Sequence, residues 1–264
     1  RKVFKQCTIR ILQINMFSAT LNDTKAFRDA IETIAQIIDE GLFKIKKTGI
    51  ELLATDRAMV ALVDFKISSS AFSSYECTEE TTAGLNLLNF LTILKRIGPE
   101  DKMGIRLNLE EQKLEIILEG KSVRRFAVPL LEISQEEVSQ IAALEFPASV
   151  EIKSDIVEQG ISDADIIADS VLIGLSPEQI IMKAEGDGNK MELTLPKGHD
   201  IISMSVNSAV RSRYPLEYLK KIIKAAKLSD SVKIMMGSDY PVKMEFKGRD
   251  IYLSFVVAPR VSDE

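Results

Sequence analysis

The chain has 264 residues, 45% hydrophobic and 28% charged, enough to bury one large core or two of ordinary size. No apolar run approaches the roughly 20 residues of a membrane helix, so we expect a soluble protein with no membrane partner. A net charge of −5 argues against tight binding of nucleic acid through phosphate neutralisation, but it leaves room for a local basic patch.

The cysteines and the histidine give no sign of a metal centre. Cys7 and Cys77 lack a CxxC spacing, and His199 is the single histidine. A structural zinc site is therefore excluded and a disulfide framework is not expected. We predict no cofactor and no bound metal, and treat residues 1–15 as an N-terminal extension of unknown role.

The first half of the chain reads as strand, helix, strands, helix, strands. Residues 17–21 alternate as a strand, and Asn22, Asp23 or Thr24 can cap a helix that runs to about Asp39. Short alternating segments follow, broken at Thr48-Gly49 and at 56–58. A second helix is expected over 87–97 before Gly98-Pro99, and three strands over 103–109, 113–118 and 122–128 finish the half.

The second half repeats this order. An offset of 130 places Phe27 over Val157 and Ile31 over Ile161, and an offset of 129 places Lys95 over Lys224. Constant offsets that keep helix and strand phase indicate an internal duplication. We predict an α+β fold of two similar domains, 16–130 and 147–264, each with two helices packed on antiparallel sheet. Residues 131–146 are the interdomain connecting loop.

Two segments are candidates for exposed sheet edges, which invite pairing with another chain. One is the strand 122–128 that ends the first half. The other, interpreted as its counterpart, is a hairpin over 185–195 with an Asp187-Gly188 turn.

The sequence resembles the DNA sliding clamps of the archaeal and eukaryotic proliferating cell nuclear antigen (PCNA) family, in its archaeal form. The carrying segments are LLATDRAMVALVDF (52–65), NLLNFLTILKRIGPED (86–101), the connecting loop, LEYLKKIIKAAKLSDSVKI (216–234) and FVVAPRV (255–261). The resemblance runs from Met16 to Val261, and the order of the segments together with the repeat makes it specific.

The resemblance implies a ring of three such chains around duplex DNA, acting as a processivity factor and as a docking platform for DNA polymerase, flap endonuclease and ligase. Twelve helices about 10 Å wide give a circumference of about 120 Å and an opening of roughly 28 Å. A duplex can pass through it. The implied partners are two further clamp subunits, duplex DNA without sequence preference, enzymes carrying a short hydrophobic docking motif and a clamp loader. The implied location is the prokaryotic cytoplasm, at the nucleoid.

For the DNA-facing surface we select basic residues on the polar faces of the predicted helices, which can touch phosphates without reading bases. The alternative is an ordinary solvated helix face. The first helix of the second half departs from the family, because it carries Asp155, Glu158, Asp163 and Asp165. The DNA candidates are Lys25, Arg28, Lys95, Arg96, Lys220, Lys221, Lys224 and Lys227.

The family's partner site is a hydrophobic pocket between the connecting loop and the C-terminal segment, where clients insert a short 3₁₀ turn and add a strand. Val138, Ile141 and Leu144 give the loop apolar residues at intervals of three. They can wall that pocket, pack onto their own sheet, or do both. Carried over by position, the pocket residues are Met59, Val60, Val138, Ile141, Pro241, Val256, Ala258 and Pro259.

The implied subunit contact joins strand 122–128 of one chain to about residues 190–195 of the next, with two arginines able to select an acidic neighbour. A homotrimer and a heterotrimer both stay open. The interface candidates are Ser122, Arg124, Arg125, Phe126, Lys190, Met191 and Leu193.

An enzyme is the weaker reading of the sequence. Asp163, Asp165 and Asp169 could suggest a metal site and Asp56-Arg57 acid–base chemistry, but aspartates at these offsets on one helix do not converge on one ion. The chain also lacks a Gly-rich phosphate loop, a nucleophile elbow and HExxH. A checkpoint-type ring subunit of the same fold is the nearer alternative.

Overall fold

The computed structural model describes residues 16–21, 23–134, 144–198 and 200–260. The N-terminal extension 1–15, Asn22, His199, Val138 and Ile141 lie outside the described residues. The first half contains β1 (Phe17–Leu21), α1 (Thr24–Ile34), β2 (Glu40–Lys46), β3 (Gly49–Thr55), β4 (Ala61–Ser68), η1 (Ser69–Ala71), β5 (Phe72–Cys77), β6 (Thr81–Asn86), α2 (Leu87–Leu94), β7 (Lys102–Asn108), β8 (Lys113–Glu119) and β9 (Val123–Pro129).

The second half runs through the same order and confirms the predicted duplicated α+β fold. Its elements are β10 (Ala148–Lys153), α4 (Ser154–Ile167), β11 (Ser170–Leu175), β12 (Gln179–Gly186), β13 (Asn189–Pro196), β14 (Ile201–Val206), β15 (Val210–Pro215), α5 (Leu216–Ile222), η2 (Ile223–Leu228), β16 (Ser231–Met236), β17 (Val242–Lys247) and β18 (Ile251–Val257). Individual hydrogen bonds repeat as well. Leu87 N donates to Asp39 O at 2.8 Å, and Leu216 N donates to Asp169 O at 2.9 Å.

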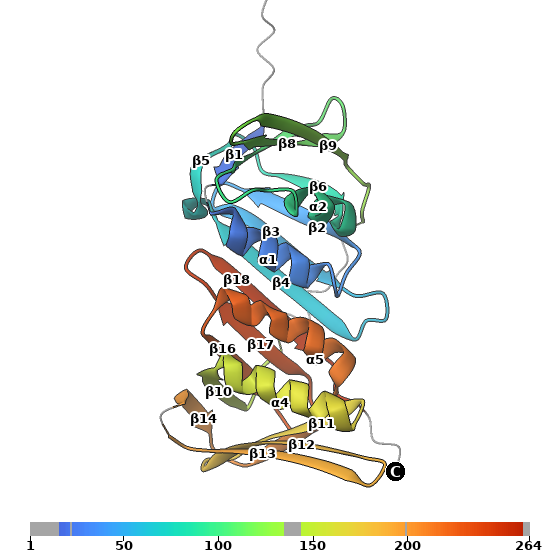
Figure 1. The fold of residues 1–264 in the computed structure, drawn as a ribbon, viewed down its shortest axis with the longest axis vertical. Coiled ribbons are helices and arrows are strands. Elements are labelled where there is room, and N and C mark those ends of the chain that lie inside the picture. Colours follow the sequence, from blue (N-terminus) through green and yellow to red (C-terminus); the bar gives the residue numbers. More distant parts are fainter. Residues whose placement is uncertain (1–15, 22, 135–143, 199, 261–264) are drawn as a thin grey trace, which may run out of the picture.

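The strands form three antiparallel sheets, and the largest runs through both halves. Its nine strands lie in the order β14-β10-β16-β17-β18-β4-β3-β2-β6, so β18 pairs with β4 in the middle. A five-stranded sheet (β5-β1-β7-β8-β9) closes one end of the molecule and a four-stranded sheet (β13-β12-β11-β15) the other. Figure 1 shows β8 and β9 at one end of the long axis and β13 at the opposite end.

The helices form a row along the long axis, where α1, α5 and α4 follow one another (Figure 1). Helix α2 contacts α1, α1 contacts η2, and α4 contacts both η2 and α5. Apolar faces of these helices, including Phe27, Ile31, Phe90, Val157 and Leu219, are buried against the sheets in one continuous core. The row exists because helical spacing puts the apolar side chains on one face and leaves the polar side chains on the other.

Both helices of the first half end earlier than the sequence indicates. Asp23 caps α1, since its carboxylate accepts from Lys25 N at 3.2 Å, but α1 stops at Ile34 instead of about Asp39. Beyond Ile34 the backbone bonds of Gln36 and Ile37 shorten to the i−3 type, and α2 tightens in the same way after Leu94. Ile38 and Ile97 remain buried, so the apolar pattern continues past the end of each helix. For this reason the sequence predicts both helix ends too late.

The repeat assigns β9 a different counterpart from the predicted one. The counterpart of β9 is β18, since FAV at 126–128 matches FVV at 255–257, and the hairpin strand β13 is the counterpart of β4. The predicted pairing of strand 122–128 with hairpin 185–195 as repeats is therefore wrong. The prediction treated the two segments as repeats because both were candidate edge strands. The strand order in the sheets shows instead which strands repeat each other.

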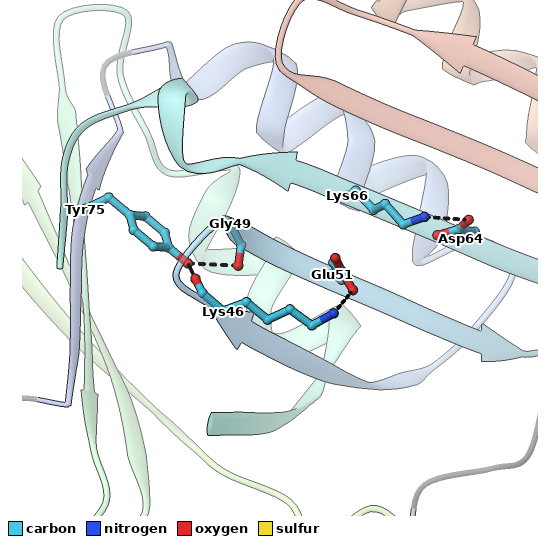
Figure 2. Close-up of polar contacts among 6 residues, drawn as sticks. All are labelled: Lys46, Gly49, Glu51, Asp64, Lys66 and Tyr75. Carbon is cyan, nitrogen blue, oxygen red and sulfur yellow. Dashed lines mark hydrogen bonds and ion pairs between the residues drawn. The ribbon is translucent and has the colours of Figure 1, made fainter. Parts of the chain in front are cut away.

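Tyr75 joins the five-stranded sheet to the large one. Its hydroxyl on β5 lies 2.5 Å from Lys46 O and 2.9 Å from Gly49 O, the two ends of the β2–β3 turn (Figure 2). Gly49 has φ +145°, and a Cβ there would come within 2.1 Å of Ile67 O. Glycine is required at position 49 because the φ angle is positive and because a Cβ would clash with Ile67 O.

Candidate functional site

Basic side chains gather on one part of the helix row. α5 and η2 carry Lys220, Lys221, Lys224 and Lys227 within eight residues, and all four are at least partly exposed. Lys25, Arg28, Lys95 and Arg96 lie on or beside α1 and α2, again at least partly exposed. The structure therefore places all eight predicted DNA-contacting residues on helices of the same row or directly beside them.

Several of these cations are engaged within the chain. Lys95 pairs with Glu32 at 2.7 Å, and this hydrogen bond lowers the pKa of Glu32. Lys220 pairs with Asp165 at 2.9 Å, and Lys224 donates to Gln36 at 2.7 Å. These exposed contacts are weak and screened by salt, so the lysines can exchange them for phosphates.

The acidic residues noted in the sequence lie on helix α4. Asp155, Glu158 and Asp165 are exposed, and no basic side chain lies within α4 itself. Positive charge is therefore centred on α5 and η2, with α4 as an acidic flank.

A tight turn between β3 and β4 presents Met59. The buried carboxylate of Asp56 accepts from Val60 N and Ala61 N, both at 2.8 Å, and from Ala58 N at 3.3 Å. Met59 adopts φ +55° and its side chain is 70% exposed. The turn thus stores a strained conformation and holds a large apolar side chain in water.

The C-terminal segment lies against this turn. Ala258 N donates to Val60 O at 2.9 Å, and Pro241 directly precedes the strand that pairs with β18. On the outer face of the large sheet Val256 lies opposite Leu62, and Leu53 and Leu144 pack on this pair. The structure therefore brings Met59, Val60, Val256 and Ala258 together, with Pro241 and Pro259 beside them.

Sequence reasoning missed two members of this outer patch, Leu53 and Leu62. Their signal was present, because LV at 62–63 and LL at 52–53 are adjacent apolar pairs in strands that otherwise alternate. An apolar residue on each face of a strand indicates that both faces are covered. Leu144 was noted in the loop, and its contact with the patch shows that the loop's end packs on its own sheet.

The sequence-predicted interface residues lie on two strand edges. Strand β9 pairs only with β8 and β13 only with β12 among the described residues. On β9, Arg124 and Phe126 face inward, whereas Arg125 is exposed on the other face. Arg124 donates to Arg96 O at 2.9 Å and pairs with Asp101. On β13, Met191 and Leu193 pack on the core and Lys190 pairs with Glu185 at 2.8 Å; Ser122 is exposed just before β9.

Three of the four carboxylates that could suggest an enzyme, Asp56, Asp165 and Asp169, have structural partners. Asp165 pairs with Lys220, and Asp169 pairs with Arg260 at 2.5 Å, a contact whose hydrogen bond lowers the pKa of Asp169. Arg57 pairs with Asp39 at 3.2 Å, away from the Asp56 carboxylate. Within the described residues no three metal-ligating side chains gather, and no described helix is long and apolar enough to cross a membrane.

The repeated fold, the shared sheet and the helix row define the class of protein, a two-domain clamp. Comparison with known proteins agrees. Residues 16–140 match the family model for the proliferating cell nuclear antigen N-terminal domain, and residues 140–261 match that for its C-terminal domain. The chain belongs to the PCNA family.

Relatives and solved structures cover nearly the whole chain. A DNA polymerase sliding clamp of Thermococcus onnurineus is 35% identical over 249 residues, 94% of this chain and 99% of that protein. The corresponding clamp of Pyrococcus furiosus is 33% identical over the same shares. The crystal structure of PCNA from Thermococcus kodakaraensis aligns with a TM-score of 0.86 at 26% identity, covering 92% of this chain and all of that one. The Entamoeba histolytica structure, at 24% identity and a TM-score of 0.87, supports the fold alone.

Proposed function

We propose that this chain, which is a DNA sliding clamp subunit, forms a closed ring that encircles duplex DNA and carries replication and repair enzymes along it. The observation that carries the proposal is the single row of α2, α1, α5 with η2, and α4. In a ring built from such chains this row lines the central channel. The proposed domains are 16–130 and 147–264, joined by the loop 131–146.

Encirclement explains how an acidic protein can hold DNA. A ring is retained by topology, so it needs only weak, mobile contacts with phosphates. The lysines of α5 and η2 supply these contacts, because they are at least partly exposed and lie on the helix face that points away from the core. They reach phosphates without base contacts, which suits a protein that slides.

The outer patch and the β3–β4 turn form the client site. Met59, Val60, Pro241, Val256, Ala258 and Pro259 are its described members, and Val138 and Ile141 are added from the sequence. A short hydrophobic docking motif of a polymerase, flap endonuclease or ligase fits because the turn exposes Met59 beside the apolar residues of the C-terminal segment. The assignment as a DNA sliding clamp also implies a clamp loader as a partner and the nucleoid as the location. No catalytic residue is part of the proposal.

The edges of β9 and β13 close the ring. They lie at opposite ends of the long axis, so contact between them is head to tail (Figure 1). A head-to-tail contact forms a ring when the rotation from each chain to the next brings the last chain back to the first. Three chains supply six domains.

A topological experiment tests the proposal. The protein is assembled around a nicked circular plasmid, freed of unbound subunits by gel filtration, and the plasmid is then cut once. We expect the protein to stay on the circle at moderate salt and to leave after the cut. Retention on the linear product with open ends would contradict encirclement, and blocking both ends of the linear DNA should restore retention.

A further inference from the structure

We propose that the outer face of the large sheet carries a second docking pocket where the two halves of the chain meet, and that it binds an acidic segment of a partner protein through one apolar side chain and the carboxylates beside it. The pocket lies within a single chain, so the proposal does not depend on ring closure. We call it the junction pocket. Its lining includes Thr48, Lys66, Lys247, Arg249, Ile251 and Tyr252.

Both halves of the chain build the junction pocket. One wall comes from β3 and β4 of the first half, and the other comes from β18 and the turn at 248–250 of the second half. The volume is about 330 Å³, at the lower end of the range for ligand pockets. The pocket therefore suits a bulky side chain better than a large cofactor.

A row of directly opposed side chains crosses this part of the outer face. Glu51 on β3 lies opposite Lys66 on β4, and Tyr252 on β18 lies opposite both Lys66 and Lys247. Lys66 Nζ is 5.3 Å and Lys247 Nζ is 6.0 Å from the centre of the Tyr252 ring. These are cation–π distances, so the ring holds an ammonium group on each side of itself in the sheet.

The walls are held by hydrogen bonds within the chain. Tyr75 fixes the β2–β3 turn through two backbone carbonyls, one of them that of Gly49 in the pocket wall (Figure 2). On the other side Ser68 N donates to Asp250 O at 2.9 Å, and Ser70 Oγ donates to Asp250 Oδ1 at 2.8 Å. The pocket is therefore formed before a ligand arrives, and binding needs little further ordering of the protein.

The cations of the pocket are available to a ligand. The side chain of Arg249 is 97% exposed and lies 3.9 Å from Asp250, close to the limit of an ion pair. Lys66 reaches Asp64 at 3.3 Å (Figure 2), and Lys247 reaches Glu245 at 3.4 Å. Exposed pairs of this kind contribute little to stability, so the three cations can turn to the carboxylates of a partner. The planar guanidinium of Arg249 can hold a carboxylate through two hydrogen bonds.

The carboxylates among these cations favour a peptide over nucleic acid. Glu51 and Asp250 line the pocket together with the three cations, and Asp64 lies beside Lys66. A phosphate backbone carries one negative charge per nucleotide and would be repelled by these carboxylates. A peptide can place a single carboxylate at each cation and its N–H groups at the carboxylates of the pocket.

Tyr252 supplies the apolar contact. Its hydroxyl donates to Glu245 Oε1 at 2.8 Å, and burial raises the pKa of Tyr252, so the phenol stays protonated. An aromatic or aliphatic side chain can pack on the neutral ring, with Ile251 beside it. In an extended peptide the residues two positions before and after this anchor lie on the same side, about 7 Å away, where carboxylates can meet Lys66 and Lys247.

The junction pocket and the client site lie at opposite ends of the same two strands. Strand β4 runs from Ala61, next to the turn that presents Met59, to Ser68 in the pocket, about 23 Å of extended chain. Strand β18 runs from the pocket to the C-terminal segment. A partner segment in the junction pocket therefore leaves the client site free.

Fluorescence anisotropy with the full chain tests the pocket. The probe is a fluorescein-labelled peptide in which one phenylalanine is flanked on both sides by aspartates and glutamates. We expect saturable binding that weakens as salt is added. The same peptide with glycine in place of phenylalanine should bind at least tenfold more weakly, because it lacks the anchor.

Two triple variants that remove the same charge show whether the pocket is the site. The pocket variant carries Lys66→Gln, Lys247→Gln and Arg249→Gln, and it should raise the Kd of the probe at least tenfold. The control variant carries Lys102→Gln, Arg106→Gln and Lys113→Gln on the five-stranded sheet, and it should leave the Kd unchanged. Both variants should keep the affinity of the client site for its hydrophobic docking peptide, which shows that they are folded.

Three outcomes would overturn the proposal. One is an equal loss of affinity in both triple variants, which would mean that the probe responds only to overall charge. The second is a probe that never saturates the wild-type chain. The third is a single-stranded oligonucleotide that binds as tightly as the probe and is weakened by the pocket variant alone, which would assign the pocket to nucleic acid. Retention on circular DNA is measured separately, so failure of the proposed ring is distinguishable from failure of the pocket.

Discussion

The hydroxyl of Tyr218 on α5 donates to the Asp56 carboxylate of the β3–β4 turn at 2.7 Å, across 162 residues of sequence. Helix α5 belongs to the basic row, and the turn presents Met59. One hydrogen bond therefore links the surface proposed for DNA to the surface proposed for clients.

Tyr218→Phe removes this bond, and the loss should destabilise the fold by about 1–3 kcal/mol, because the acceptor is a buried carboxylate. Affinity for a client peptide should also fall, since the turn loses a support. Chemical denaturation and peptide titration measure the two effects. The matched control is Tyr75→Phe, which removes a hydroxyl elsewhere; equal loss of peptide affinity in both variants would show that the effect is general.

Met59→Asp should weaken a hydrophobic docking peptide at least tenfold, because it places a charge in an apolar contact. Stability should change by less than about 0.5 kcal/mol, since the side chain is 70% exposed. Peptide fluorescence anisotropy is the measurement. Ile202→Asp, at a 58% exposed apolar residue on β14, should leave the affinity unchanged.

Lys221→Ala with Lys227→Ala should weaken DNA binding and reduce the slope of log K against log salt by about 0.9 for each phosphate that the protein no longer neutralises. The readout is a salt titration with non-specific duplex. Lys66→Ala with Lys247→Ala, two lysines beside Tyr252 away from the helix row, serves as the control. If both double variants changed the slope by the same amount, DNA would not bind specifically at the lysines of α5 and η2.

Gly84→Ala should destabilise the protein by about 1–3 kcal/mol through overpacking. A Cβ at Gly84 would lie 2.2 Å from Leu131 O, where the connecting loop leaves the first half with Leu131 N bonded to Gly84 O at 2.9 Å. Gly104→Ala meets only ordinary contacts at 3.6 Å and should cost far less. Thermal unfolding compares the two.

Stability should fall as the pH rises above about 10, the ordinary pKa of tyrosine. Burial raises the pKa of Tyr75, Tyr214, Tyr218 and Tyr252 in the folded chain, and the bond to Asp56 adds to the shift of Tyr218. Above the unfolded value only the unfolded chain releases these protons, so their contribution is present below about pH 10 and lost beyond it. In an alkaline titration, the phenolate absorbance of these tyrosines should therefore stay low above about pH 10 while the chain is folded, and rise when the chain unfolds.

The sequence predicted the fold well where the periodicity was strong. Strand 17–21 follows directly from alternation, and α2 begins at Leu87 as predicted. Helix ends were overestimated because Ile38 and Ile97 stay buried in turns that continue the apolar pattern. To identify the counterpart of β9, one must know which strands are neighbours in the sheets. No local sequence pattern contains that information.

The site was predicted in part. Exposed lysines on a helix face can be read from spacing, and so can an acidic α4. The roles of Asp56 and Tyr218 could not be read, because the hydrogen bond between them depends on how the two halves pack. Arg124 and Arg125 looked alike in sequence, yet adjacent strand residues point to opposite faces, and only Arg125 remains exposed for a neighbour.

The unbroken sheet through β4 and β18 has a mechanical consequence. Its centre is buried on the core side by Val63, Phe65, Leu253 and Phe255, so flexing the chain there would shear backbone hydrogen bonds and expose apolar surface together. Each chain is thus a stiff unit of two domains. A ring of such units has its weak seams only where one chain meets the next, and DNA must enter through a seam that parts and reseals without unfolding either domain.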